Sequence, residues 1–186
     1  SILNNAEGRN LFDGCTGIRS WSAPRDTIRV PNGMFTGCKN LASVTLVDTV
    51  TTISDSAFSG CSRLTAITLP EGLTELGWMA FSSTALKEIT VPVGVKTLDS
   101  TFSYCSSLKT VVLEGVETIG TSTFLGCTGL QTGVSLPDTL RTICSSAFGN
   151  CSNIFLEVPE AVEVIQQQAF NGAYHIYYYG KAVDGA

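Results

Sequence analysis

The sequence predicts a β-rich α/β solenoid, in which one repeat of about 23 residues is wound eight times. The first observation is a series of eight phenylalanines spaced by 23, 23, 23, 21, 22, 24 and 22 residues, most of them followed by Gly and Cys. The second is a short alternating run of apolar and polar residues in each repeat, and the third is a proline soon after several of these runs. The eight residues are Phe12, Phe35, Phe58, Phe81, Phe102, Phe124, Phe148 and Phe170.

The alternating run predicts one short strand in each turn. In the clearest repeat, Ile67 and Leu69 would point to one side while Thr68 points to the other. Pro70 follows and ends the strand, because proline cannot donate to a strand ladder. Stacking these strands predicts a parallel sheet along one side of the coil. The equivalent runs are residues 44–46, 89–91, 111–113 and 134–136.

The remainder of each repeat predicts turns rather than a second long strand. Leu73, Leu76 and the pair Ala80 and Phe81 are spaced by 3, 4 and 1, which favours short helical or irregular turns on the convex side. The glycine two residues after most of the phenylalanines predicts a left-handed turn, since glycine tolerates positive φ. Ser83 and Tyr104 occupy that position in the middle of the chain, where we expect local distortion.

The whole chain, residues 1–186, is expected to be one solenoid domain. Terminal turns of a stack must differ from the inner ones, because they have only one neighbour. We therefore expect residues 1–11 to form an N-terminal cap with a short helix, residues 12–170 about seven repeats, and residues 171–186 a degenerate last turn with a C-terminal cap. Changes in repeat length predict bulges before Leu86, before Phe102, between Leu113 and Ile119, and at the inserted Gly133.

Composition excludes several classes of partner. The net charge is −5 and the 11 Lys and Arg residues are scattered, so we expect no nucleic-acid partner. No apolar run approaches the roughly 20 residues that cross a bilayer, so we expect no membrane insertion by this chain. Its start at Ser1 without a methionine fits a mature protein or a fragment of a longer one. We expect a monomer.

The repeat resembles a known family. The pattern Leu-x-x-Ile-x-Leu-Pro-x-x-Leu-x-x-Leu-x-x-x-Ala-Phe-x-Gly-Cys, which runs from about Leu11 to Tyr179, is similar to the bacterial surface-antigen (BspA-like) leucine-rich repeats, also called the Treponema type. The resemblance implies a right-handed leucine-rich-repeat solenoid with the sheet on its concave face, in a secreted or cell-surface protein. It also implies adhesion to host matrix proteins or to other cells. The family motif contains no partner-specific residue.

Six of the seven cysteines follow the repeat phenylalanine by three residues, where Thr84 and Ala173 stand in the other turns. Small occupants predict a ladder of buried, reduced thiols. A zinc site needs converging ligands with Cys-x-x-Cys-like spacing, and parallel side chains one turn apart keep the Cβ atoms too far apart for disulfides. Cys144 lies outside the ladder, and we expect its thiol to be the most accessible. The ladder comprises Cys15, Cys38, Cys61, Cys105, Cys127 and Cys151.

The sequence offers little for catalysis, so no catalytic residue, metal or cofactor is predicted. The only histidine, His175, lies in the degenerate last turn, where we expect a cap residue rather than a general base. Most carboxylates fall in the turns after the strands or on the return path, where a solvated rim is expected. A carbohydrate-active enzyme on the same coil remains an alternative, and it would need acids and bases clustered on the sheet.

Two candidate binding surfaces remain. The leading hypothesis is a non-enzymatic module that presents its concave face to a protein or glycan, and a structural spacer of a larger surface protein is a further alternative. The aromatic C-terminal end, Tyr174, Tyr177 and Tyr178, is the second surface, because tyrosine is favoured at interfaces. The candidate residues of the concave face are Thr45, Arg63, Thr68, Lys87, Glu88, Thr90, Lys109, Val112 and Ser135.

Overall fold

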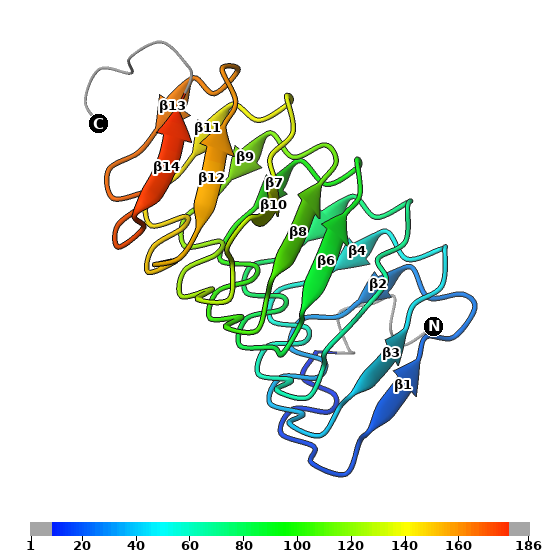
Figure 1. Ribbon diagram of the computed structural model, residues 1–186. Coiled ribbons are helices and arrows are strands. Elements are labelled where there is room, and N and C mark those ends of the chain that lie inside the picture. The colour runs from blue at the N-terminus through cyan, green and yellow to red at the C-terminus, as the bar shows by residue number, and fades with distance from the viewer. Residues whose placement is uncertain (1–8, 179–186) are drawn as a thin grey trace.

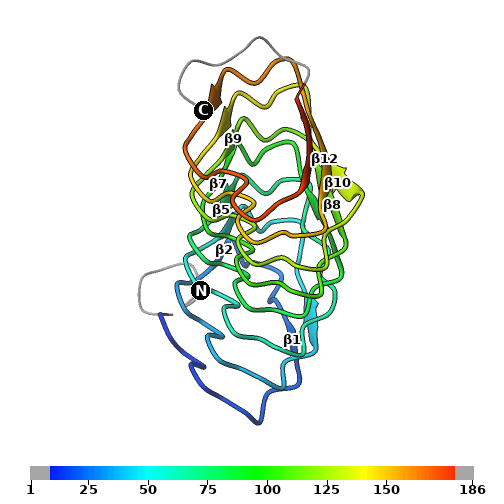
Figure 2. The same ribbon diagram turned by 60° about the vertical axis from the view of Figure 1, so that its left-hand side comes forward.

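The computed structural model describes residues 9–178, which form one coil of about seven stacked turns of parallel strands (Figure 1). Most of the predicted N-terminal cap and residues 179–186 of the predicted C-terminal cap lie outside the described residues. Two rows of strands run the length of the coil, and Figure 2 shows them on opposite sides of it. Within residues 9–178 there is no helix that could cross a membrane.

The first row, which we call the long-strand face, is the side that the sequence predicts to be concave. Its strands pair in parallel as three separate sheets, β1-β3, β6-β8-β10 and β12-β14. The predicted strand at Ile67–Leu69 is wrong, because residues 64–70 form no strand and leave a break between β3 and β6. Conversely, the turn around Trp21, a poor match to the repeat, does contain a strand. The strands are β1 (Ser20–Ser22), β3 (Ser43–Thr45), β6 (Glu88–Val91), β8 (Thr110–Leu113), β10 (Gly133–Ser135), β12 (Phe155–Val158) and β14 (His175–Tyr178).

The second row, the short-strand face, consists of two-residue strands on the return path. They pair in parallel in the orders β2-β4-β5 and β7-β9-β11-β13. The predicted helical turns are wrong for the described residues, which contain no helix, and the coil is therefore a β-solenoid. The strands are β2 (Arg29–Val30), β4 (Thr52–Ile53), β5 (Glu75–Leu76), β7 (Thr97–Leu98), β9 (Thr118–Ile119), β11 (Thr142–Ile143) and β13 (Val164–Ile165).

The Phe-x-Gly-Cys segment between the two rows shows why no helix forms there. The N–H groups of Phe58 and Gly60 donate to carbonyls of the next turn, those of Ala80 and Ser82, at 2.8 Å each. The intervening N–H groups bond three residues back within their own turn, as from Cys61 to Phe58 at 3.2 Å. Half of the donors are thus committed to the neighbouring turn, and the i to i−4 bonds of a helix cannot form.

Positive φ angles occur twice in each turn, four residues apart, and they also interrupt any helix. The predicted left-handed residue after phenylalanine is confirmed, with φ of 73° at Gly60 and 58° at Asn150. The distortion expected at Ser83 and Tyr104 is wrong, because both adopt the same conformation, with φ of 57° and 60°. The second left-handed position was not predicted; it is occupied by Asn10, Gly33, Ser56, Met79, Ser100, Ser122, Ser146 and Gln168.

The repeat phenylalanines stack through the centre of the coil. Successive rings from Phe12 to Phe170 lie 5.2–5.8 Å apart between centroids and 6–18° from parallel. The six inner rings are fully buried, and leucine, isoleucine and valine side chains from both strand rows surround them. Each turn therefore buries its apolar residues against the turn before and the turn after, as in other solenoids.

The cysteine ladder is confirmed for Cys38, Cys61, Cys105, Cys127 and Cys151, which are buried and reduced, whereas Cys15 in the first described turn is exposed. The thiols also have a bonding role. Cys61 Sγ donates to the carbonyl oxygen of Phe35 at 3.2 Å, and Cys151 Sγ donates to that of Phe124 at 3.1 Å. Desolvation raises the pKa of both thiols to about 12 and suppresses their reactive thiolate forms.

The expectation that Cys144 is the most accessible thiol is wrong. Cys15 is exposed, whereas Cys144 is only partly accessible. Burial, followed by the negative charge of Asp99, raises the pKa of the Cys144 thiol. Cys15 lies in the first described turn, and within residues 9–178 no earlier turn packs on it.

Gly133 produces the bulge predicted for the inserted residue. Elsewhere on the long-strand face, a strand residue donates to the residue before its partner, as Thr110 does to Lys87 while pairing with Glu88. Phe155 instead donates to Gln131, one residue earlier than this register requires, at 2.7 Å. The insertion therefore separates β10 from β12. At the three other sites where a bulge is predicted, the phenylalanine stack remains continuous.

Candidate binding face

The long-strand face presents one row of outward side chains, with one residue from each turn. The register places Ser22 beside Thr45, Thr90 beside Val112, and Glu157 beside Tyr177. Most of these side chains are exposed, and Val112 is half-buried. The structure thus brings the predicted sheet residues into one row. In chain order the row is Ser22, Thr45, Thr68, Thr90, Val112, Ser135, Glu157 and Tyr177.

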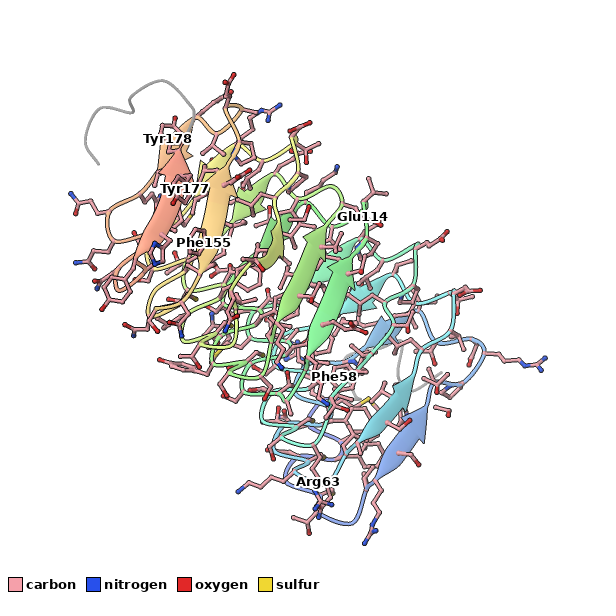
Figure 3. The ribbon with its side chains drawn as sticks, in the orientation of Figure 1. Phe58, Arg63, Glu114, Phe155, Tyr177 and Tyr178 are labelled. Carbon is pink, nitrogen blue, oxygen red and sulfur yellow. The ribbon has the colours of Figure 1, made fainter. Side chains whose placement is uncertain are left out.

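Charges of opposite sign flank this row along most of its length. The segments that lead into the strands carry exposed basic residues, which we call the basic rim: Arg19, Lys39, Arg63, Lys87 and Lys109. The segments that follow the strands carry exposed acidic residues, which we call the acidic rim: Asp26, Asp48, Glu71, Glu114, Asp138 and Glu160. Figure 3 shows Arg63 and Glu114 at opposite edges of the face.

The structure refines the predicted group of Lys87, Glu88 and Lys109. Lys87 and Lys109 lie on adjacent turns of the basic rim, where the N–H of Lys109 donates to the carbonyl of Lys87 at 2.8 Å. Glu88 begins β6 and pairs with Thr110 of β8, so its exposed side chain belongs to the sheet itself. The three residues form one polar area in the middle of the long-strand face.

The aromatic C-terminal end is continuous with the same face, so the two surfaces predicted separately are one. Tyr177 is 46% exposed, and Tyr174, which precedes β14, is 75% exposed. Tyr178 was predicted to share this surface but does not. It lies on the inner side of β14, packs against the hydrophobic core and donates to the carbonyl of Val162 at 3.5 Å. We therefore exclude Tyr178 from the candidate site.

The prediction of this face omitted four residues, Ser22, Phe155, Glu157 and His175. Phe155, which is 43% exposed, stacks on His175 with ring centroids 4.4 Å apart and planes 15° from parallel. Glu157 stands between them and the acidic rim. The run at residues 156–159 repeats the strand-then-proline pattern of residues 134–137, and this signal would have identified Glu157 as an outward residue.

Grooves open where the strand ladder is interrupted. One groove of about 740 Å³ lies at the break after β3, between residues 44–48 and 68–72. A second, of about 470 Å³, extends from residues 67–71 to β6 and includes Glu71, Glu88 and Glu114. A third, of about 430 Å³, lies at the break between β10 and β12, and its lining includes Phe155 and Tyr177. Each lies on the long-strand face or its rim.

One of these grooves contains the carboxylates of Glu71, Glu88 and Glu114, and His175 lines none of the three. His175 contacts the ring of Phe155, an arrangement that provides no nucleophile for the imidazole to activate. Among residues 9–178, no three His, Cys, Asp or Glu side chains converge in a way that could hold a metal ion. What the face offers is an extended surface of hydroxyl groups, opposite charges and, at one end, aromatic rings.

Comparison with known proteins assigns the repeat. The profile described as "BspA type Leucine rich repeat region" matches residues 8–109 and 98–179, with six copies of the repeat. The chain belongs to this family. The BspA-type motif supplies the buried phenylalanine stack, whereas the rims and the aromatic end lie at positions that vary from one turn to the next.

Solved structures of bacterial leucine-rich-repeat proteins share this fold. A protein from Eubacterium ventriosum is 32% identical, with a TM-score of 0.77 over 83% of this chain and 43% of its own. A Treponema pallidum protein is 28% identical, with a TM-score of 0.74 over 78% of this chain and 69% of its own. The pneumococcal vaccine antigen PcpA is 23% identical over 83% of this chain and 48% of its own, with a TM-score of 0.54. No curated protein matches the chain. The chain spans less than half the length of the Eubacterium protein.

Proposed function

We propose that this BspA-type chain is a non-enzymatic binding module outside the cell, and that its long-strand face engages a protein or glycan ligand. The observation that carries the proposal is an exposed polar row bordered by a basic rim on one side and an acidic rim on the other. A partner with the complementary arrangement of charges would be oriented before contact, because opposed charges steer association and fix register. The row gives such a partner several turns of continuous surface.

The location outside the cell is supported by the family, and the burial of most of the thiols is compatible with it. BspA-type leucine-rich-repeat proteins are surface-associated. Free cysteines in an oxidising environment form disulfides only where thiolates can meet. Five thiols of this chain are buried in single file, and desolvation raises the pKa of Cys61 and Cys151 to about 12. These five thiols are thus protected from oxidation by packing, whereas Cys15 is exposed.

The test is a binding screen with a pair of matched variants. The purified chain is applied to immobilised matrix proteins and glycans, and any hit is followed by surface plasmon resonance at low and high salt. The rim variant Lys87→Ala/Lys109→Ala removes two cations beside the row. The control Lys96→Ala/Arg141→Ala removes two cations next to the short-strand face, where their exposed ion pairs with Glu117 and Glu163 contribute less than about 1 kcal/mol each.

The rim variant should lower the association rate by about tenfold at low salt, and high salt should abolish the difference. The association rate of the control variant should stay within about twofold of that of the parent chain. Equal effects of the two variants would reject the long-strand face as the binding surface. Failure to bind any ligand would favour the spacer, and turnover of a glycan would favour an enzyme.

A further inference from the structure

The aromatic end of the long-strand face contains a ring with one covered side and one open side. Phe155 stacks on His175 of the next turn at 4.4 Å, and the ring of Tyr177 lies 5.8 Å from that of Phe155. The equivalent position in the preceding turn is Gly133, which has no side chain. The side of Phe155 away from His175 borders the groove whose lining includes Thr132 and Val134.

The backbone of the bulge requires glycine at position 133. A Cβ at Gly133 would collide with the carbonyl oxygen of Lys109, so no other residue fits without moving β10. Because β10 does not pair with β12, the strands separate and the inner side chains Val134 and Leu156 form the floor of a groove. Its volume is about 430 Å³, and its lining residues are Thr132, Val134, Phe155, Leu156, Glu157 and Tyr177.

The charge of this end differs from that of the centre. Glu157 is the only charged residue that lines the groove. The basic rim ends at Lys109, and from there to residue 178 the long-strand face and its rims carry carboxylates but no lysine or arginine. Arg141, the one arginine in that stretch, precedes β11, pairs with Glu163 and donates to the backbone carbonyl of Asp138 at 2.7 Å. An anionic groove with aromatic walls is complementary to a cation that has a planar, weakly hydrated surface.

We propose that this groove binds an arginine side chain presented by a basic segment of a partner protein. A guanidinium can stack on the open side of Phe155 while its N–H groups donate to the carboxylate of Glu157. The methylene stem would contact Val134 and Leu156, and the hydroxyl of Thr132 lies at the groove wall. The inference rests on the proposed function, since it assigns a protein partner to one end of the binding face. A neutral glycan would use the ring without using the carboxylate, and this difference can be tested.

The experiment is an NMR titration of the ¹⁵N-labelled chain with short peptides. The probes are acetyl-Gly-Ser-Arg-Ser-Gly-amide and its counterparts with lysine or glutamine in place of arginine, and chitotriose serves as the glycan probe. Amide shifts at residues 132–134 and 155–157 report the groove directly. The arginine peptide should bind about tenfold more tightly than the glutamine peptide, with lysine between them, because only arginine can both stack and pair in a bidentate manner.

Two variants and two controls complete the design. Phe155→Ala and Glu157→Gln should each weaken binding of the arginine peptide by at least about fivefold. Trp78→Ala and Glu163→Gln remove an exposed ring and an exposed carboxylate away from the long-strand face, and binding should stay within about twofold. Far-ultraviolet circular dichroism and thermal melting establish that all four variants remain folded.

Several results would overturn the inference. Equal affinity for the arginine and glutamine peptides, or no shift at the groove with any peptide, would reject an arginine site. Chitotriose binding that is lost in Phe155→Ala but unchanged in Glu157→Gln would replace it with a glycan site. A further outcome is a protein from the binding screen that binds less tightly when Lys87 and Lys109 are replaced and equally well to Phe155→Ala. That result would support the proposed function and reject the groove as part of the binding surface.

Discussion

The buried thiols of Cys61 and Cys151 should make this coil unusually sensitive to alkaline pH. Desolvation raises the pKa of each thiol from about 9 to about 12 in the folded chain. In the unfolded chain the same thiols ionise near their ordinary pKa, about 8.5–9. Between the two values the folded state binds more protons than the unfolded state. The free energy of unfolding therefore falls as pH rises through this window and is unaffected by these thiols below it.

The size of the effect follows from the shift. Each thiol loses about 1.4 kcal/mol of stabilisation per pH unit above its unfolded pKa. From about pH 8 to about pH 10.5 the loss is about 2 kcal/mol for each thiol and about 4 kcal/mol for the two together. Because domains of this kind are stable by about 5–15 kcal/mol, the change is large enough to measure.

The measurement is urea unfolding under reducing conditions at a series of pH values, with the double variant Cys61→Ser/Cys151→Ser as comparison. A hydroxyl is compatible with this position, since Thr84 occupies it and donates to the carbonyl of Phe81 at 2.9 Å. Each protein is compared with itself at about pH 8, so the direct cost of the substitutions cancels. The variant should lose about 4 kcal/mol less than the parent by about pH 10.5. If the free energy of unfolding falls equally with pH in the two proteins, the assignment of raised pKa values to these thiols is refuted.

Three further predictions concern packing, backbone and accessibility. Phe81→Ala should lower the free energy of unfolding by about 3–5 kcal/mol, because the ring is fully buried and stacked on both sides. Phe12→Ala, at the partly buried first ring, should lower it by less. Equal losses of unfolding free energy for the two variants in urea would contradict the stack. Ser83→Gly should stabilise the chain by up to about 1 kcal/mol in the same assay, since φ at Ser83 is 57° and a side chain is strained there; a loss of stability would mean that the side chain has an essential contact. In mass-spectrometric alkylation, Cys15 should react first and Cys144 more slowly, and the buried thiols should react only on unfolding; early modification of a buried thiol would contradict its burial.

The repeat itself could be predicted from the sequence because each of its residues has a local physical role. Phenylalanine at a fixed interval stacks in the core, and glycine after it permits positive φ, as at Gly60. Alternation at Val111–Leu113 gave the correct strand and the correct side for each residue. These features depend on one turn at a time, which is the information that a single sequence contains.

Features that depend on the relation between two turns could not be predicted in the same way. Ser56 and Met79 adopt positive φ although their side chains do not favour it, because the N–H of each must reach the next turn. Residues 67–69 alternate correctly and still form no strand, since their backbone does not join the ladder of β3. Ser83 appeared irregular in sequence and is regular in structure for the same reason: the neighbouring turns impose the conformation.

The candidate site follows from this division between residues that maintain the stack and residues that differ between turns. In a solenoid each turn contacts only its neighbours, so an inserted residue is accommodated locally and the stack continues on both sides. Gly133 separates β10 from β12 at the surface while Phe124 and Phe148 remain stacked at 5.2 Å beneath it. The fold can therefore open a groove on its binding face without weakening its core. Grooves at interruptions of the ladder, rather than the most regular turns, are the places where this architecture can acquire a specific ligand.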